Sequence, residues 1–188
     1  MGRAVPARRP WDDGPAAAPP RLVRALAVTR FGGIPRGYAD RGTTVAAEGH
    51  SVAKWGNWHC GEDKARFDGS WTASVPTLFE AFIEGEAVRI VLVGDQAWQV
   101  RMAGEGWLKS IHDPGAAFMP IDHELLDDAR RLAEHFGLRT VGVDYMVAPD
   151  GGRYLLEVNH VPNVTVFPEV REAYLDLVVR WAGEPTSV

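Results

Sequence analysis

Residues 140–159 read TVGVDYMVAPDGGRYLLEVN, and this stretch decides the fold. Two β-rich runs flank a Pro-Asp-Gly-Gly turn, a combination that predicts a β-hairpin. Asp144, Glu157 and Asn159 are polar residues in strands that otherwise have the composition of a buried core. Glu157 and Asn159 are two residues apart, so their side chains point to the same face of one strand. The short turn brings Asp144 on the partner strand opposite them.

The three polar side chains of this hairpin form a patch of hard oxygen ligands on a rigid support. Such a patch suits Mg²⁺ that is held partly by the phosphates of a nucleotide. Two carboxylates left unpaired on an apolar hairpin would be costly, so a cation is expected beside them. The hairpin therefore predicts a magnesium site formed by Asp144, Glu157 and Asn159. The alternative is a sheet edge whose carboxylates form salt bridges with basic side chains.

The rest of the chain alternates between predicted strands and helices. Apolar runs at 77–83 and 87–93 predict two strands joined by a Glu-Gly-Glu connector, and residues 96–102 predict the strand that returns after a Gly-Asp turn. The helical spacing of apolar residues predicts helices at 122–136 and 170–181. Together these elements predict an α+β fold in which helices pack on a mainly antiparallel sheet.

The hairpin resembles the metal-binding hairpin of the ATP-grasp superfamily, in which an Asp in a G-x-D strand is followed by E-V-N. Upstream segments resemble further parts of that family in the family's order, so the resemblance covers about residues 50–180. Residues 52–64 resemble the strand, lysine and phosphate loop of the RimK-like and synapsin-like branches. Residues 79–85 resemble the hinge strand that frames adenine, and residues 88–94 resemble the following strand with its arginine. The resemblance implies an ATP-grasp fold, with ATP and Mg²⁺ as cofactors.

The resemblance also implies which residues bind the nucleotide, namely Lys54, Gly56, Gly61, Glu80, Phe82 and Glu86. Lys54 would bring a positive charge to the α- and β-phosphates. Gly56 and Gly61 would let backbone amides approach phosphate and would let the loop close as a lid. The main chains of Glu80 and Phe82 would read the purine edge.

Carboxylates and arginines complete the predicted site. The ribose hydroxyls need a carboxylate just beyond the hinge, which Glu84 or Glu86 could supply. Arg89 and Arg101 lie on neighbouring predicted strands, where guanidinium groups could stabilise the transferring γ-phosphate and the tetrahedral intermediate. The alternative for each arginine is a solvated position at a sheet edge. Lys64, at the end of the phosphate loop, is assigned no role.

The resemblance implies an ATP- and Mg²⁺-dependent ligase that joins a carboxylate to an amine, or to a thiol, through an acylphosphate. An alternative from another class is a synapsin-like ATP-binding module that serves regulation or assembly without ligase turnover, and a third is one half of a split ligase. The expected partners besides ATP are a small-molecule or peptide carboxylate and an amine. Because the family generally carries a preceding domain for its second substrate, we also expect a homodimer or a partner chain that supplies it.

Composition and charge argue against several other classes of function. The formal net charge of -5 offers no field that favours nucleic acid or acidic lipid. No stretch approaches the roughly 20 apolar residues that a membrane-spanning helix needs. The single cysteine excludes an internal disulfide and a cysteine zinc site. We therefore expect a cytoplasmic protein that binds neither nucleic acid nor membrane.

Three parts are expected along the chain. Residues 1–20 are rich in Pro, Ala and Arg, which predicts a disordered lead-in. Residues 21–76 are expected to form part of the small ATP-grasp subdomain, with a helix at 21–31 and the phosphate loop. Residues 77–184 are expected to form the C-terminal subdomain that contains the metal-binding hairpin.

Overall fold

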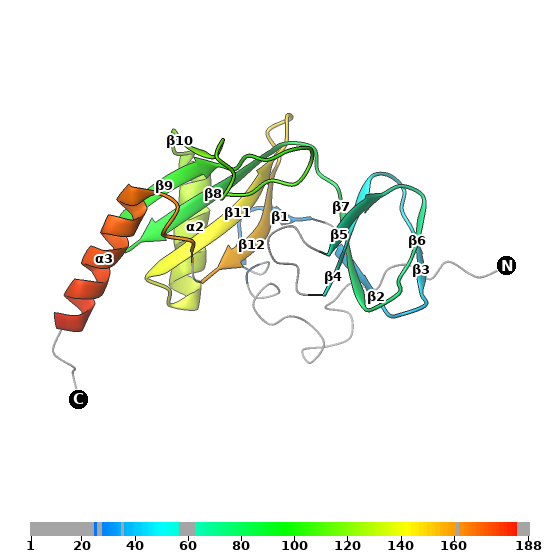
Figure 1. Cartoon of the computed structure of the whole chain (residues 1–188), viewed down its shortest axis with the longest axis horizontal. Helices are drawn as coiled ribbons and strands as arrows, with labels where there is room; N and C mark the ends of the chain where they lie inside the picture. The colour runs from blue at the N-terminus through cyan, green and yellow to red at the C-terminus, as the bar shows by residue number, and fades with distance from the viewer. Residues whose placement is uncertain (1–24, 26–27, 35, 57–62, 161, 184–188) are drawn as a thin grey trace.

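The computed structural model describes residues 25, 28–34, 36–56, 63–160 and 162–183. These residues form two main β-sheets arranged along the long axis, with two helices on the larger sheet and a two-stranded sheet beyond the smaller one (Figure 1). The sheet pairings are mainly antiparallel. The α+β fold predicted from the sequence is therefore confirmed.

The larger sheet has six strands, whose bounds are β1 Gly32–Gly33, β8 Glu86–Val93, β9 Gln96–Arg101, β10 Ala117–Met119, β11 Thr140–Val147 and β12 Arg153–Asn159. Their order across the sheet is β1-β12-β11-β8-β9-β10. The neighbours pair antiparallel except for β1, which runs parallel to β12. Because β11 pairs with β12 on one side and with β8 on the other, the predicted hairpin is held inside the sheet.

Helix α2 (His123–Phe136) covers one face of the larger sheet, and it confirms the helix predicted at 122–136. Asp122 caps its N-terminus by accepting hydrogen bonds from two backbone N–H groups, and Gly137 ends it in the left-handed conformation at φ 65°. The apolar stripe of the helix packs against alternate residues of β8 and β11. This core cluster includes Leu125, Ala129, Leu132, Val88, Ile90, Val141, Val143 and Tyr145.

One carboxylate, that of Asp128, is buried within this apolar face with no solvent exposure. It accepts hydrogen bonds from the hydroxyl of Tyr145 at 2.9 Å, the hydroxyl of Thr29 at 2.8 Å and the N–H of Arg30 at 2.5 Å. Burial, followed by the charge of Asp128, raises the pKa of Tyr145, so the phenol remains protonated as a donor. The network ties the segment before β1 to α2.

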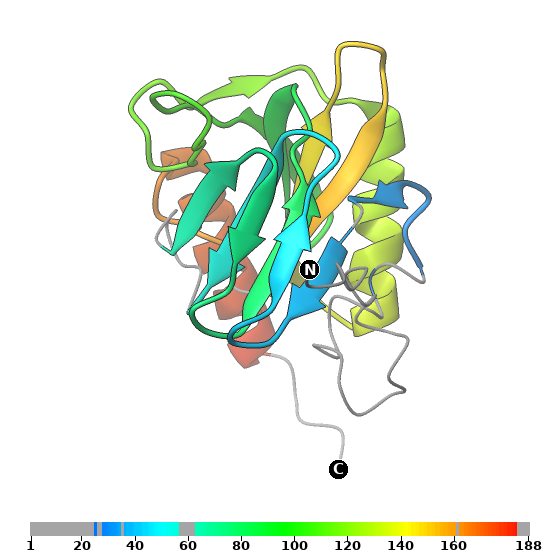
Figure 2. The same ribbon diagram turned by 90° about the vertical axis from the view of Figure 1, so that its right-hand side faces the viewer.

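Helix α3 (Pro168–Gly183) packs on the opposite face of the larger sheet, and it confirms the helix predicted at 170–181. Its buried residues Val170 and Ala173 form a cluster with Val91 and Val93 of β8. Figure 2 shows the two helices on opposite sides of the sheet. In the described residues, no helix is long and apolar enough to span a membrane.

The smaller sheet has four strands, whose bounds are β2 Arg36–Ala39, β4 Ser51–Trp55, β5 Lys64–Phe67 and β7 Thr77–Ala81. Their order is β2-β7-β4-β5, and the two-stranded sheet of β3 (Thr44–Ala46) and β6 (Ser70–Thr72) accompanies them. Aromatic side chains fill the space between this four-stranded sheet and the two-stranded sheet. Trp55 stacks on Trp71 at 5.7 Å, and Phe67 meets Phe79 edge to face at 5.7 Å.

The boundary between the two main sheets differs from the one expected before residue 77. Strand β7 pairs with β2 and β4, so the chain passes from the smaller to the larger sheet between Ala81 and Glu86. Local sequence could not show this, because the assignment depends on pairing with distant strands. The connector touches the end of β11, where a Cβ on Gly85 would lie 2.2 Å from the carbonyl oxygen of Val147. Glycine is needed at this close approach.

The N-terminal expectations are met in part. Ala25 and Val28 are helical, but Thr29, Arg30 and Phe31 are not, so the helix predicted at 21–31 ends earlier than expected. Most other residues of that helix, and the whole predicted lead-in at 1–20, lie outside the described residues. Strand β1 joins the larger sheet through its pairing with β12, rather than the smaller sheet as expected for residues 21–76.

Candidate active site

The polar residues of the hairpin meet a basic residue of the neighbouring strand. Asp144 on β11 lies opposite Glu157 on β12 and opposite Arg89 on β8. Residues directly opposite each other point to the same face of a sheet, so these three side chains form a row. Val143 and Tyr145, on either side of Asp144, face α2, which places the row on the other face. A β-bulge at Asp144/Tyr145 interrupts the register beside this row.

Arg89 and Asp144 form a buried two-point ion pair. The distances are 2.5 Å from Nε to Oδ1 and 2.7 Å from Nη2 to Oδ2, and the side chains are 12% and 9% exposed. Gly142 leaves room for the arginine, since a Cβ there would lie 3.3 Å from Cδ of Arg89. Burial lowers the pKa of Arg89, but the charge and hydrogen bonds of Asp144, together with the charge of Glu157, outweigh burial and raise it. The guanidinium therefore stays charged.

Asn159 links this buried pair to Glu157. With its amide oriented so that oxygen faces a donor and nitrogen faces an acceptor, Asn159 donates to Oε1 of Glu157 at 2.9 Å. In the same orientation its oxygen accepts from Nη2 of Arg89 at 3.3 Å. Glu157 is exposed, whereas Asp144 is buried. The structure thus brings together the three predicted metal ligands, and the carboxylate of Glu157 is the one open to solvent.

These residues fit a magnesium ion whose coordination is completed by phosphate and water. Mg²⁺ in phosphate sites is bound through one or two carboxylates plus the phosphates of the substrate. Glu157 and Asp144 supply carboxylates, and Asn159 supplies an amide oxygen. In the part of the chain that the structure describes, no group of three or more His, Cys, Asp or Glu side chains could hold a metal by itself. Two carboxylates and one amide leave further coordination positions of Mg²⁺ to phosphate and water.

A second group of charged residues lies on the smaller sheet. The ammonium of Lys54 on β4 pairs with the carboxylate of Glu80 on β7, and their side chains are 19% and 5% exposed. Lys54 also lies opposite Lys64 on β5, so the two lysines share one face. The main chain of Glu80 pairs with Arg36 on one side and Val52 on the other. Strand β7 is central in the smaller sheet, so strands flank the main chain of Glu80 on both sides, and its predicted role at the purine edge stays a prediction.

Phe82, in the connector after β7, is also engaged differently from the prediction. Its N–H donates to the carbonyl of His50 at 2.9 Å, so this donor is not free for a purine. The guanidinium carbon of Arg66 lies 4.1 Å from the centroid of its ring, and the ring of Trp107 meets it at 6.2 Å. Because Arg66 comes from β5 and Trp107 from the segment after β9, Phe82 anchors the connector between the two sheets.

The predicted phosphate loop has a tightly closed base. The chain leaves β4 at Gly56 and enters β5 after Asp63, with φ angles of 67° and 54°. The N–H of Trp55 donates to the carbonyl of Asp63 at 2.9 Å. The φ of Gly56 lies in the left-handed region, which side chains other than glycine rarely adopt, so glycine is favoured here. Gly61 lies outside the described residues, and the phosphate contacts of both glycines stay predictions.

Arg101 and Glu86 lie apart from the row. Arg101 is opposite Val88, which faces α2 in the core, so the side chain of Arg101 is on the other face from Arg89. Its Nε lies 4.0 Å from Oε1 of Glu86, and the two side chains are 56% and 45% exposed. The predicted catalytic role of Arg101 and the predicted ribose contact of Glu86 stay predictions, and the structure does not bring either residue to the row. They form an exposed pair at the end of the sheet.

Three solved structures are similar to this chain. The ATP-grasp ligase PsnB complexed with precursor peptide PsnA2 and AMPPNP has a TM-score of 0.61 and 18% identity, over 87% of this chain and 57% of that chain. The macrocyclase MdnC bound with precursor peptide MdnA, from Microcystis aeruginosa MRC, has a TM-score of 0.55 and 18% identity, over 85% of this chain and 60% of that chain. The ADP complex of purK, N5-carboxyaminoimidazole ribonucleotide synthetase, has a TM-score of 0.56 and 12% identity, over 76% of this chain and 43% of that chain.

The chain has an ATP-grasp fold. It spans 57% of the length of the PsnB chain that it matches. No model of a protein family matches the sequence, and no curated protein matches it. Within this ATP-grasp fold, the two halves of the candidate site come from different sheets: the row of Arg89, Asp144, Glu157 and Asn159 from the larger, and Lys54 with Lys64 from the smaller.

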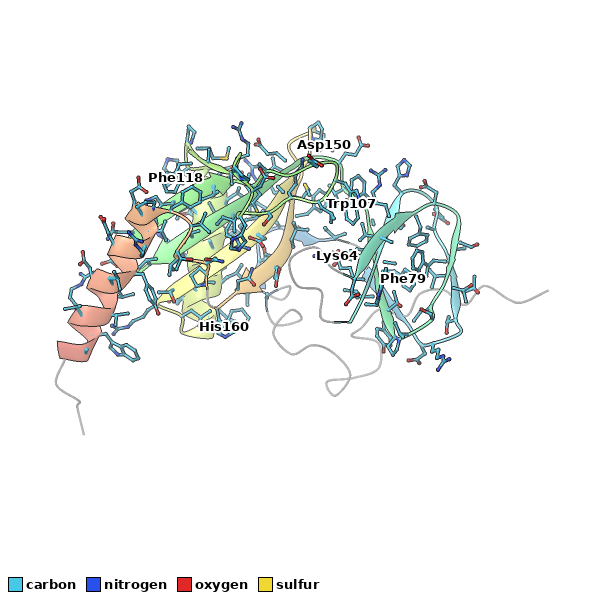
Figure 3. The ribbon with its side chains drawn as sticks, viewed as in Figure 1. Lys64, Phe79, Trp107, Phe118, Asp150 and His160 are labelled. Atoms are coloured by element: carbon cyan, nitrogen blue, oxygen red, sulfur yellow. The ribbon has the colours of Figure 1, made fainter. Side chains whose placement is uncertain are left out.

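Sequence reasoning assigned no role to Lys64, which the structure places opposite Lys54 on the smaller sheet. Figure 3 shows Lys64 at the boundary between the smaller sheet and the larger one. Burial and the charge of Lys54 lower the pKa of Lys64, while the carboxylates of Glu157, Glu80 and Asp144 act in the opposite direction. The sequence alone does not mark this residue, because the length of the loop does not fix which residue of the returning strand lies opposite Lys54.

Proposed function

We propose that this chain is the nucleotide-binding and catalytic part of an ATP- and Mg²⁺-dependent ligase of the RimK-like type. It joins a carboxylate to an amine, or to a thiol. One observation carries the proposal, namely the connected polar row of Arg89, Asp144, Glu157 and Asn159. Support for the nucleotide comes from the similar structures of PsnB with AMPPNP and purK with ADP.

The charges of the two sheets suit opposite ends of a metal–nucleotide complex. On the smaller sheet, Lys54 carries its ammonium on a flexible stem and can turn from Glu80 to a phosphate. On the larger sheet, Glu157, Asp144 and Asn159 would hold Mg²⁺, which when bound would neutralise phosphate charge. Arg89 holds Asp144 and Asn159 in place through its hydrogen bonds, and the proposal keeps its predicted role of stabilising the transferring γ-phosphate and the tetrahedral intermediate.

The proposed reaction has two steps. An oxygen of the substrate carboxylate attacks the γ-phosphorus of ATP, the bond from that phosphorus to the bridging oxygen breaks, and ADP leaves an acylphosphate behind. The amine nitrogen then attacks the acyl carbon, phosphate leaves, and the nitrogen loses its proton. The products are an amide, ADP and phosphate. Holding the reactants side by side supplies much of the rate enhancement in such a transfer.

A peptide carboxylate is the first substrate class to test. PsnB and MdnC are complexed with precursor peptides. We therefore propose that a peptide supplies the carboxylate, with a small-molecule carboxylate as the alternative. The alternative function, an ATP-binding module without turnover, predicts that no phosphate is released from ATP in the presence of these substrates.

The first prediction concerns the solvent-open carboxylate of the row. In Glu157→Gln the charge that would hold the metal is lost, so the Kd for ATP at millimolar Mg²⁺ should rise about tenfold or more, which is about 1.4 kcal/mol. Isothermal titration calorimetry measures it. The matched control is Glu134→Gln, an exposed glutamate on α2 on the other side of the sheet, which should bind ATP like the unaltered chain. An unchanged Kd in Glu157→Gln would overturn the metal assignment.

Turnover separates the ligase from the binding module. Phosphate release by the full chain is measured with ATP and Mg²⁺ in a screen of acidic peptides and amines. The ligase is expected to release phosphate when both a carboxylate and an amine are present. Tight ATP binding without phosphate release in any combination would favour the regulatory or assembly module.

A further inference from the structure

Lys64 and Lys54 are neighbours on one face of the smaller sheet. Lys64 is the first residue of β5, and its partner in the register of β4 is Lys54. Residues directly opposite each other on antiparallel strands have Cβ atoms about 4.5–5.5 Å apart. Two like charges so placed repel each other, and burial of Lys64 adds a desolvation cost.

The carboxylate on this face is already used by one of the two lysines. Glu80 forms an ion pair with Lys54. Among the residues that the structure describes, no carboxylate lies within ion-pair distance of Lys64. Among the described residues, the two lysines place two ammonium groups on this face and only Lys54 has an ion pair, an arrangement that favours an anion with several negative charges.

The charges that act on Lys64 come from both sheets. Besides Glu80, they include Glu157 and Asp144 of the hairpin. Lys64 thus lies on the side of the smaller sheet that is turned to the polar row, as its place in Figure 3 indicates. A phosphate next to Glu157, where the metal is proposed to bind, would also be near the ammonium of Lys64.

We propose that Lys64 is a second phosphate-binding residue, which contacts the terminal phosphate of ATP and makes the site select a triphosphate over a monophosphate. This inference rests on the proposed function. Lys54 and Lys64 would lie along one side of the triphosphate, and Glu157 with Asp144 would face the terminal phosphate from the other. A purely structural role for Lys64, bridging the sheets to the hairpin, would affect all nucleotides equally.

The second prediction tests this selectivity by calorimetry on the full chain with Mg²⁺. In Lys64→Gln, the Kd for ATP should rise about tenfold or more, while the Kd for AMP should change less than about twofold, because the lost contact involves the terminal phosphate. Lys64→Arg keeps the charge and should retain most of the preference for ATP. Lys109→Gln is the matched control, since Lys109 is exposed and donates to the carbonyl of Gly104.

A labelling measurement on the unaltered chain does not depend on the variants folding. An amine-acylating reagent modifies exposed lysines, and mass spectrometry follows each of the three lysines separately. ATP with Mg²⁺ should slow the modification of Lys64 at least severalfold, AMP should not, and Lys109 should react at the same rate in every sample. Equal protection of Lys64 by ATP and AMP would overturn the proposal.

The outcomes separate the inference from the function on which it rests. If the unaltered chain binds no nucleotide, the proposed function fails and this inference fails with it. If the unaltered chain prefers ATP and Lys64→Gln keeps the same preference, the inference alone is overturned. A parallel loss of ATP and AMP binding would assign Lys64 a structural role.

Discussion

The larger and the smaller sheet each contain one buried carboxylate paired with a basic residue, but the two pairs are built differently. In Arg89–Asp144 two parallel hydrogen bonds fix a planar guanidinium that is 12% exposed. In Lys54–Glu80 a single ammonium on a flexible stem meets the carboxylate and is 19% exposed. The first pair is suited to hold a fixed geometry. The second is suited to change its partner when an anion arrives.

The packing around the two pairs follows the same division. The larger sheet has a helix on each face, with a core of valine, isoleucine and leucine side chains against α2. The described part of the smaller sheet is packed against two short strands through aromatic rings. The proposed metal site would have the rigid support of the larger sheet, and the lighter packing of the smaller sheet would suit the proposed binding of a nucleotide.

The third prediction would break this comparison if it failed, and its effect is the largest. Asp144→Ala leaves a buried arginine without its partner and should lower the free energy of unfolding by about 3–5 kcal/mol. Glu80→Ala should cost about 1–2 kcal/mol, because the stem of Lys54 can carry its ammonium to solvent. Urea denaturation measures the two variants. Equal losses would show that the two pairs are held with equal rigidity.

The fourth prediction sharpens the comparison at the connector between the sheets. Gly85→Ala places a Cβ against the carbonyl of Val147 and should lower the free energy of unfolding by about 1–3 kcal/mol. The control is Gly49→Ala, where a Cβ meets nothing within 4 Å; its effect should be within about 0.5 kcal/mol. Thermal unfolding measures the loss of stability in each of the two variants. No loss in Gly85→Ala would mean that the connector can move away from β11.

Sequence reasoning succeeded where the residues that meet are close together in the sequence. The hairpin places Asp144 opposite Glu157 because its turn is short, so counting residues is sufficient. The same counting applies to β9, where the two-residue Gly94-Asp95 turn pairs Val93 with Gln96 and so places Arg101 opposite Val88. Because strand side chains alternate, Arg101 lies on the face opposite Arg89. The prediction grouped the two arginines by their neighbouring strands and did not count their faces.

Two further residues show what local patterns conceal. Lys64 lies opposite Lys54 after a loop whose length does not fix the register, so no residue count predicts the pairing. Asp128, by contrast, left a signal: it interrupts the apolar stripe of α2 between Leu125 and Leu132, where a charged residue requires partners. Its partners Tyr145 and Thr29 are distant in sequence, and the structure was needed to identify them.

The fifth prediction has the smallest effect and compares a partly buried ion pair on the larger sheet with an exposed one on the smaller. Arg153 joins β12 to the start of α2 through Asp122, with Nη2 to Oδ2 at 2.8 Å, and the two side chains are 27% and 24% exposed. His50 and Asp68 form the exposed pair, at 53% and 63%. Burial tends to raise the pKa of Asp122, but the hydrogen bonds from Arg153 and from two backbone amides outweigh it and lower the pKa.

A lowered pKa in the folded state means that ionised Asp122 stabilises the protein above its unfolded pKa, and that this contribution disappears as the pH falls through the folded pKa. At about pH 6, Arg153→Met should therefore be less stable than the unaltered chain by about 0.5–1 kcal/mol, after allowance for solvent screening. The difference should shrink as the pH is lowered below about 3.8, the ordinary range of an aspartate. Urea denaturation across this range measures it, with His50→Ala as the control, expected within about 0.3 kcal/mol of the unaltered chain at pH 6 because its pair is exposed. A stability difference for Arg153→Met that stayed constant with pH would show that the arginine acts through packing on the helix start rather than through the charge of Asp122.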